Sequence, residues 1–116
     1  MTPTEAKAFA EKHCSVWNTH DLERILDLYA PDAELASPLA AQLTGGGVVK
    51  GRDALRDYFS AALKTYPDLR FGLVNTLLCV DSVVLYFTSV NDQLVAEVLF
   101  LNGDGKVSKV FAHYAC

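Results

Sequence analysis

Apolar residues recur at helical spacing in three stretches of the first half of the chain. The first stretch runs from residue 4 to residue 17, with Thr4 as its expected N-cap. Its apolar face consists of Ala6, Phe9, Ala10, His13, Val16 and Trp17. Asp21 is the expected cap of a second helix, which Pro31 ends because the residue before a proline disfavours helical backbone. The third helix is expected from Arg52 to Thr65.

The remaining segments have the patterns of strands and loops. Residues 33–37 form a short expected strand, and residues 39–51 an expected loop. Four runs rich in β-branched and aromatic residues follow, at residues 69–80, 82–90, 93–101 and 107–114. Helices first and a meander of strands afterwards predict an α+β domain, in which three N-terminal helices pack on a curved antiparallel sheet of four to six strands.

The run 82–90 is apolar on both of its faces. Val83, Leu85 and Phe87 alternate with Val84 and Tyr86. An antiparallel sheet with one wet face would place polar residues at alternate positions. Each face is therefore expected to be covered, one by the helices and the other by a second copy in a homodimer.

Composition narrows the class of protein. The chain has 116 residues, which fits a single domain over 1–116, and its net charge of −4 without a basic run argues against nucleic acid as a partner. The three cysteines are far apart and odd in number, so we expect no disulfide framework, no metal site and a reducing cytoplasm. No apolar run reaches the roughly 18 residues of a membrane span, and no signal peptide is visible, so no membrane association is expected. No sequence motif predicts the binding of a cofactor.

His13 is the first candidate for chemistry, because it lies beside Phe9 and Trp17 on the apolar face of the first helix. An imidazole there can act in a pocket as acid, base or hydrogen-bond donor. The alternative is a core histidine that bonds a backbone carbonyl. The aromatic residues on apolar stripes have the same two interpretations, core or pocket lining: Trp17, Tyr29, Tyr58, Phe59, Tyr86 and Tyr114.

Glu97 is the second candidate, because it stands in the middle of an apolar run, Val95-Ala96-Glu97-Val98-Leu99. If its side chain points inward, it is a candidate base whose pKa burial would raise. If it points outward, it belongs to the second face, with His113 or Lys109 as a partner. A register change of one residue would exchange these faces.

The glycines at 45–47 resemble a phosphate-binding loop only superficially. No Lys-Ser or Lys-Thr follows them at the required spacing, and no parallel strand–loop–helix unit surrounds them. A flap over a pocket mouth is the better interpretation of this loop.

Several segments together resemble the nuclear transport factor 2-like superfamily, and most closely its SnoaL-like polyketide-cyclase and ketosteroid-isomerase-like branch. The resemblance rests on residues 28–38, 51–59, 66–71 and 105–114. It implies a cystatin-like cone, with three helices closing the concave side of the sheet around an internal pocket and commonly a dimer across the convex side. Because the superfamily includes isomerases, cyclases, dehydratases, hydrolases and binding modules, the resemblance specifies the fold better than the function.

The resemblance also assigns positions to the pocket. The family's proton-shuttling aspartate falls at Ser37, its first oxyanion-binding tyrosine at His13, and its second oxyanion donor near Leu94 in a gap-free alignment. Supporting aromatics fall at Tyr29, Phe59 and Tyr114, with Tyr58 beside Phe59. This alignment places Leu94 inward and Glu97 and His113 outward. Since Ser37 is no carboxylate, the standard ketosteroid-isomerase mechanism is not expected.

Three functions therefore remain open. The first is a cofactor-independent enzyme that performs acid–base chemistry on a small apolar, oxygen-bearing molecule through His13, as an isomerase, cyclase or hydrolase would. The second is a ligand-binding module without catalysis, and the third is a dimerisation domain that acts through the convex face of the sheet.

Overall fold

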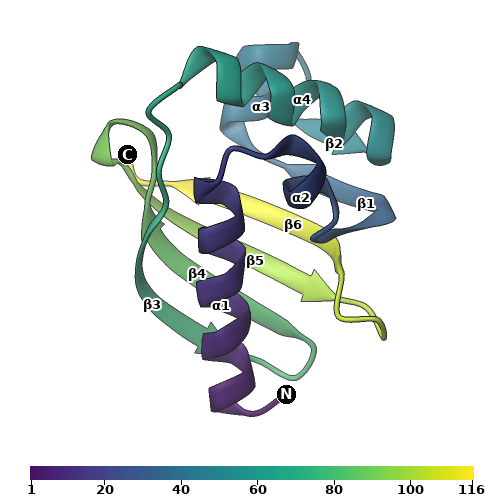
Figure 1. The fold of residues 1–116 in the computed structure, drawn as a ribbon, viewed down its shortest axis with the longest axis vertical. Helices are drawn as coiled ribbons and strands as arrows, with labels where there is room; N and C mark the ends of the chain where they lie inside the picture. The colour runs from purple at the N-terminus through teal and green to yellow at the C-terminus, as the bar shows by residue number, and fades with distance from the viewer.

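A long N-terminal helix crosses the concave side of the sheet in the computed structural model, which describes residues 1–116 (Figure 1). This helix, α1 (Pro3–Asn18), is capped by Thr2 and not by Thr4. The Thr2 hydroxyl accepts a hydrogen bond from the Glu5 N–H at 3.1 Å, and the Glu5 carboxylate accepts one from the Thr2 N–H at 2.8 Å. This reciprocal capping box satisfies two N–H groups at the start of the helix, and therefore outweighs the single cap expected from Thr4.

The second helix is shorter than its pattern suggested. Asp21 caps α2 (Leu22–Leu26) as expected. The helix ends at Leu26, however, and Pro31 lies inside the strand β1 (Tyr29–Ala36). The pairing of β1 with its neighbour shifts register between Tyr29 and Glu34, and such an irregularity accommodates a residue without an N–H.

The expected loop 39–51 contains two further elements, α3 (Pro38–Thr44) and β2 (Val48–Lys50), so that prediction was wrong. The Ser37 hydroxyl caps α3 by accepting from the Leu39 N–H at 3.2 Å, with Pro38 in the first turn. Gly45, at φ +82°, ends it in the left-handed conformation that glycine favours. The next helix, α4 (Arg52–Thr65), has the predicted bounds.

The last four strands follow the predicted order: β3 (Gly72–Leu78), β4 (Ser82–Thr88), β5 (Leu94–Leu101) and β6 (Val107–Tyr114). A short 3-10 turn, η1 (Val90–Asp92), joins β4 to β5. The sheet has six strands in the order β2-β1-β6-β5-β4-β3. Its one parallel pair, β1 with β6, corrects the expectation of a purely antiparallel sheet. Two parallel strands need a long connection between them, and the chain from β1 to β6 supplies one.

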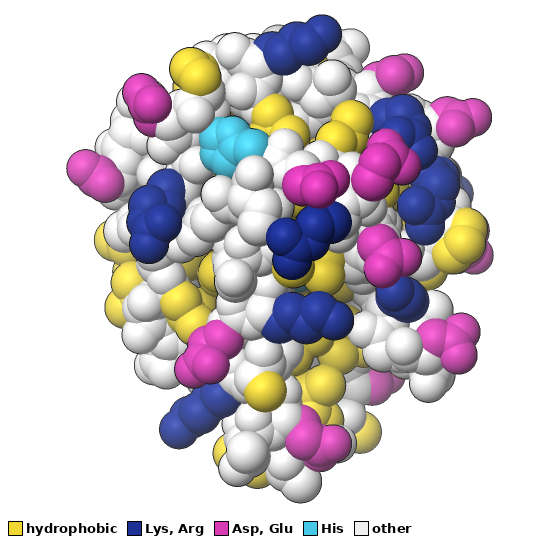
Figure 2. Space-filling view, in the orientation of Figure 1, with side chains coloured by type: hydrophobic (Ala, Val, Ile, Leu, Met, Phe, Trp, Pro, Cys, Tyr) yellow, Lys and Arg dark blue, Asp and Glu magenta, His cyan; other side chains and the backbone are white.

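All four α-helices lie on one side of the curved sheet, which confirms the α+β class with one more helix than expected. A cluster of 27 buried apolar residues fills the space between them. The outer face of the sheet exposes several large apolar side chains, among them Val74, Leu77, Leu94 and Phe111. On the helical face, by contrast, basic and acidic side chains are intermingled (Figure 2). None of the helices is both long and apolar enough to cross a membrane.

Candidate functional site

A small cavity of about 30 Å³ lies between the helices and the concave face of the sheet. Fourteen residues line it, eleven of them hydrophobic. Six residues singled out in the sequence lie together on its wall: Trp17, Tyr29, Ser37, Tyr58, Phe59 and Tyr114. We call this space the inner cavity.

Glu97 also lines the inner cavity, and only 9% of the residue is exposed. Its neighbours across the sheet are Leu85 on β4 and Ala112 on β6, and both are buried. The outward placement that the resemblance implied for Glu97 is therefore wrong, as is the inward placement of Leu94, which is 36% exposed. Side chains alternate along a strand, so Leu94 and Glu97, three residues apart, must point to opposite faces.

The remaining candidate on the neighbouring strand, His113, is exposed on the outer face, as the resemblance implied. Its Nδ1 lies 3.2 Å from the Phe111 carbonyl oxygen. It pairs across the strands with Ala96 and not with Glu97. His113 therefore takes no part in the inner cavity.

His13 faces Glu97 from α1, and none of its surface is exposed. The His13 Nε2 lies 3.8 Å from Glu97 Oε1, which is too long for a hydrogen bond. Neither ring nitrogen of His13 has a hydrogen-bond partner, and neither does Oε1 of Glu97. The interpretation of His13 as a core histidine bonded to a backbone carbonyl is thus wrong, because neither ring nitrogen bonds a carbonyl oxygen.

Burial changes the protonation of this pair. Loss of hydration lowers the pKa of His13 to about 4 and raises the pKa of Glu97 to about 7. Between these two values the imidazole is neutral and the carboxyl carries the proton. Near neutral pH Glu97 exists in both forms, which is the property of a group that takes up and releases protons readily.

Three tyrosines line the inner cavity together with Glu97. The Trp17 Nε1–H donates to the Tyr29 hydroxyl oxygen at 3.2 Å. Burial raises the pKa of Tyr29, of Tyr58 and of Tyr114, the last to about 12. These phenols stay protonated at neutral pH, so they can donate hydrogen bonds to an oxygen atom of a bound molecule.

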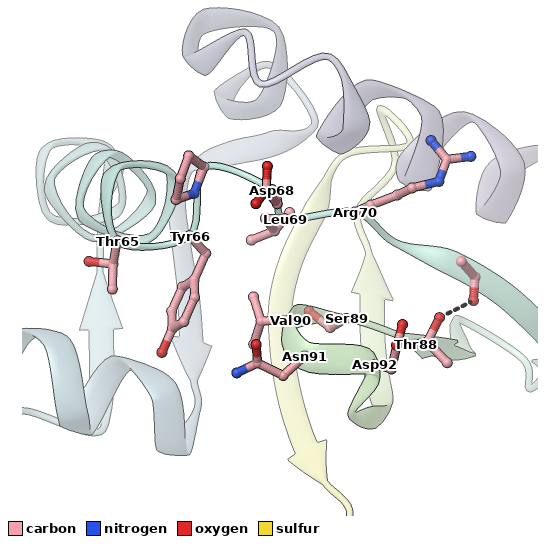
Figure 3. A pocket seen from close by; sticks show the side chains of 12 residues that line it. Thr65, Tyr66, Asp68, Leu69, Arg70, Thr88, Ser89, Val90, Asn91 and Asp92 are labelled. Carbon is pink, nitrogen blue, oxygen red and sulfur yellow. Dashed lines mark hydrogen bonds between the residues drawn. The ribbon is translucent and has the colours of Figure 1, made fainter.

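A second hollow, the outer cleft, has a volume of about 650 Å³ and opens to solvent. Its walls are the end of α4 with the loop that follows it, and the β4–β5 connection (Figure 3). Leu69 and Ser89 line both the outer cleft and the inner cavity. Sequence reasoning missed the cleft because its walls are turn residues; the two turn signals Tyr66-Pro67-Asp68 and Asn91-Asp92 lie on opposite sides of it and mark its position.

His13 is also at the base of a third hollow, a groove of about 230 Å³ between α1 and the β5–β6 turn. Lys12, Asp27 and Lys106 lie along this groove. His13 therefore lines this groove while its Nε2 lies 3.8 Å from Glu97, which is not among the residues of the groove.

The fold and the cavity define a cone-shaped α+β protein with an internal polar pair in an apolar pocket. The SnoaL-like domain family matches residues 10–114, and the chain belongs to this family. The predicted resemblance is thereby confirmed.

Solved structures agree with this membership. A SnoaL-like protein of unknown function from Burkholderia thailandensis is 36% identical, with a TM-score of 0.93 over 100% of this chain and 99% of that one. A candidate isomerase of the SnoaL-like family from Agrobacterium tumefaciens is 20% identical, with a TM-score of 0.78 over 97% and 99% of the two chains. The epoxide hydrolase/cyclase-like enzyme SalBIII, which has a role in pyran ring formation in salinomycin, is 17% identical, with a TM-score of 0.75 over 97% and 92%. No curated protein is significantly similar in sequence.

Proposed function

We propose that this protein binds a small apolar, oxygen-bearing molecule and catalyses proton transfer on it, with Glu97 as the acid–base group and His13 as its partner. The observation that carries the proposal is the pair itself, a carboxyl and an imidazole 3.8 Å apart, both buried, with three polar atoms that have no hydrogen bond. Such groups are expensive to bury and contribute little stability. The presence of this unsatisfied pair in the interior therefore fits a catalytic role better than a structural one.

The chemistry follows from the protonation states. The deprotonated Glu97 takes a proton from carbon next to a carbonyl, and the electron pair moves onto the carbonyl oxygen. Tyr58 and Tyr114 line the same cavity, and their protonated hydroxyls can stabilise that oxygen. The protonated Glu97 then returns the proton. His13, neutral at this pH, can pass protons between Glu97 and the groove behind it, because an imidazole accepts at one nitrogen while it releases at the other.

The test follows the exchange of the methyl protons of acetophenone for deuterium by NMR in D₂O. We expect the rate to rise with pH through about 7, as Glu97 loses its proton. Glu97→Gln should lower the rate by roughly 100-fold or more, the usual effect of removing a general base. His13→Ala should lower it less, because it removes the partner and not the base.

Glu11→Gln is the matched control, since Glu11 is an exposed carboxylate on α1. It should leave the rate unchanged. Exchange that is no faster than in buffer, or that is equal in Glu97→Gln and the parent chain, would reject the proposal.

The outer face of the sheet supports a second role, homodimerisation. Val74 is 58% exposed, and Phe111 is 36% exposed. A second copy would remove these apolar side chains from water. Sedimentation velocity should then show a dimer, and Phe111→Asp should produce a folded monomer, while Val80→Asp in the β3–β4 turn should not. A monomeric parent chain at micromolar concentration would contradict this role.

A further inference from the structure

The inner cavity is too small for a whole substrate. Its volume is about 30 Å³. Small-molecule sites usually measure roughly 300 to 1,000 Å³. The outer cleft, at about 650 Å³, lies within that range.

The two spaces meet at Leu69 and Ser89. Ser89 is only 8% exposed. Its backbone N–H donates to the Gln93 carbonyl oxygen at 2.8 Å, whereas its hydroxyl makes no hydrogen bond within the chain. The Ser89 hydroxyl oxygen is not one of the fully buried atoms that lack a partner, so it is accessible at the junction of the cavity and the cleft and is positioned to bond a molecule that passes through it.

The side chains around the cleft define what it can hold. Asp68 lies on one side, and Asn91 and Asp92 lie on the other. The guanidinium of Arg70 extends away from Asn91 and Asp92 (Figure 3), and Arg70 also lines a separate hollow beside α1. Arg70 is the one cationic residue among those that line the cleft, against the two carboxylates of Asp68 and Asp92, and this excess of negative charge disfavours an anionic ligand.

We propose that the outer cleft holds the bulk of the substrate, an amphiphilic molecule with a neutral or cationic polar extension. Its small apolar, oxygen-bearing end passes between Leu69 and Ser89 toward Glu97. The Ser89 hydroxyl bonds the substrate at the junction, and Asp68, Asn91 and Asp92 contact its extension. This inference rests on the proposed function and names the substrate class for the same site.

The test uses three acetophenones that carry, on the same para linker, a primary amine, a hydroxyl or a carboxylate. Trp17 is the only tryptophan of the chain and lines the inner cavity, so its fluorescence reports binding. We expect the amine to bind at least tenfold more tightly than the carboxylate, with the hydroxyl compound between them. Ser89→Ala should weaken all three by about fivefold, the effect of one lost hydrogen bond.

The double variant Asp68→Asn, Asp92→Asn should remove the preference for the amine over the carboxylate. Asp32→Asn, Asp81→Asn is its control, because it removes the same charge from exposed positions outside the cleft. It should keep the preference. Ser89→Leu, which fills the junction, should abolish the response of Trp17 to all three compounds while the chain keeps its circular dichroism spectrum.

Binding that is unaffected by Ser89→Ala and Ser89→Leu, or a carboxylate that binds as tightly as the amine, would overturn the inference. If deuterium exchange still depends on Glu97 in that case, the proposed function stands and only the role of the cleft is rejected. If none of the three compounds changes the fluorescence of Trp17 and Glu97→Gln has no effect on exchange, both proposals are rejected.

Discussion

Two polar pairs connect α1 to the sheet, and they differ in one respect. Trp17 and Tyr29 are joined by a hydrogen bond of 3.2 Å. One turn earlier on the same helix, His13 faces Glu97 at 3.8 Å without a hydrogen bond. All four residues are buried. The first pair has the geometry of a structural contact, whereas the second leaves polar atoms unsatisfied, so we expect the two pairs to respond differently to substitution and to pH.

The largest expected effect concerns pH. Glu97 has its pKa raised from 4.5 to about 7 in the folded chain, so the folded state binds its proton more strongly and stability falls as pH rises between these values. His13 has its pKa lowered from 6.5 to about 4, so the unfolded state binds its proton more strongly and stability rises with pH between 4 and 6.5. From about pH 4.5 to 6.5 each state holds one proton on the pair, and the two effects cancel.

Single variants should expose the two opposing effects. In His13→Leu the free energy of unfolding should fall by about 3 kcal/mol between pH 4.5 and 7, because only Glu97 remains. In Glu97→Gln it should rise by about 3 kcal/mol between pH 4 and 6.5, because only His13 remains. Urea denaturation at intervals of half a pH unit measures both slopes. If the pH profiles of the parent chain and both variants were parallel, burial would not shift the pKa values of His13 and Glu97, and this prediction would be wrong.

At constant pH, a substitution in the Trp17–Tyr29 pair should lower the free energy of unfolding more than one in the His13–Glu97 pair. Tyr29→Phe leaves the buried Trp17 Nε1–H without a partner, which should cost about 1–3 kcal/mol in the free energy of unfolding. Glu97→Gln at pH 4, where the carboxyl is protonated in the folded chain and largely protonated in the unfolded one, replaces one neutral group by another of the same shape and breaks no hydrogen bond at Oε1, so it should cost under about 1 kcal/mol. The opposite order of the two losses would mean that Glu97 has a structural role.

The inner cavity shows how far sequence reasoning reached. Five of the six aromatic residues on apolar stripes were located correctly, because helical and strand periodicities fix which face of an element is buried. Tyr86 was not: it is half-buried and pairs with Ala96 on the outer face of the sheet. The position of Glu97 was not located correctly either, because its strand is apolar on both faces and a carboxyl fits neither pattern. Only the pairing of Glu97 with Leu85 and Ala112 decides its face. The short α3 was missed because the glycines at 45–47 dominate its pattern, although Ser37 and Pro38 are a typical start of a helix.

The smallest effect is expected from a substitution on the outer face of β6, opposite the face that carries the inner cavity. His113 lies opposite Ala96, one residue before Glu97, but on the exposed side of the sheet. His113→Gln should change the free energy of unfolding by less than about 0.5 kcal/mol, as is usual for surface substitutions. It should also leave the flat pH profile between 4.5 and 6.5 unchanged, because the groups that produce it, His13 and Glu97, face the other side. A slope that appeared in His113→Gln would show that the outer histidine is coupled to the inner carboxyl through the sheet, and the contrast between the two faces would then fail.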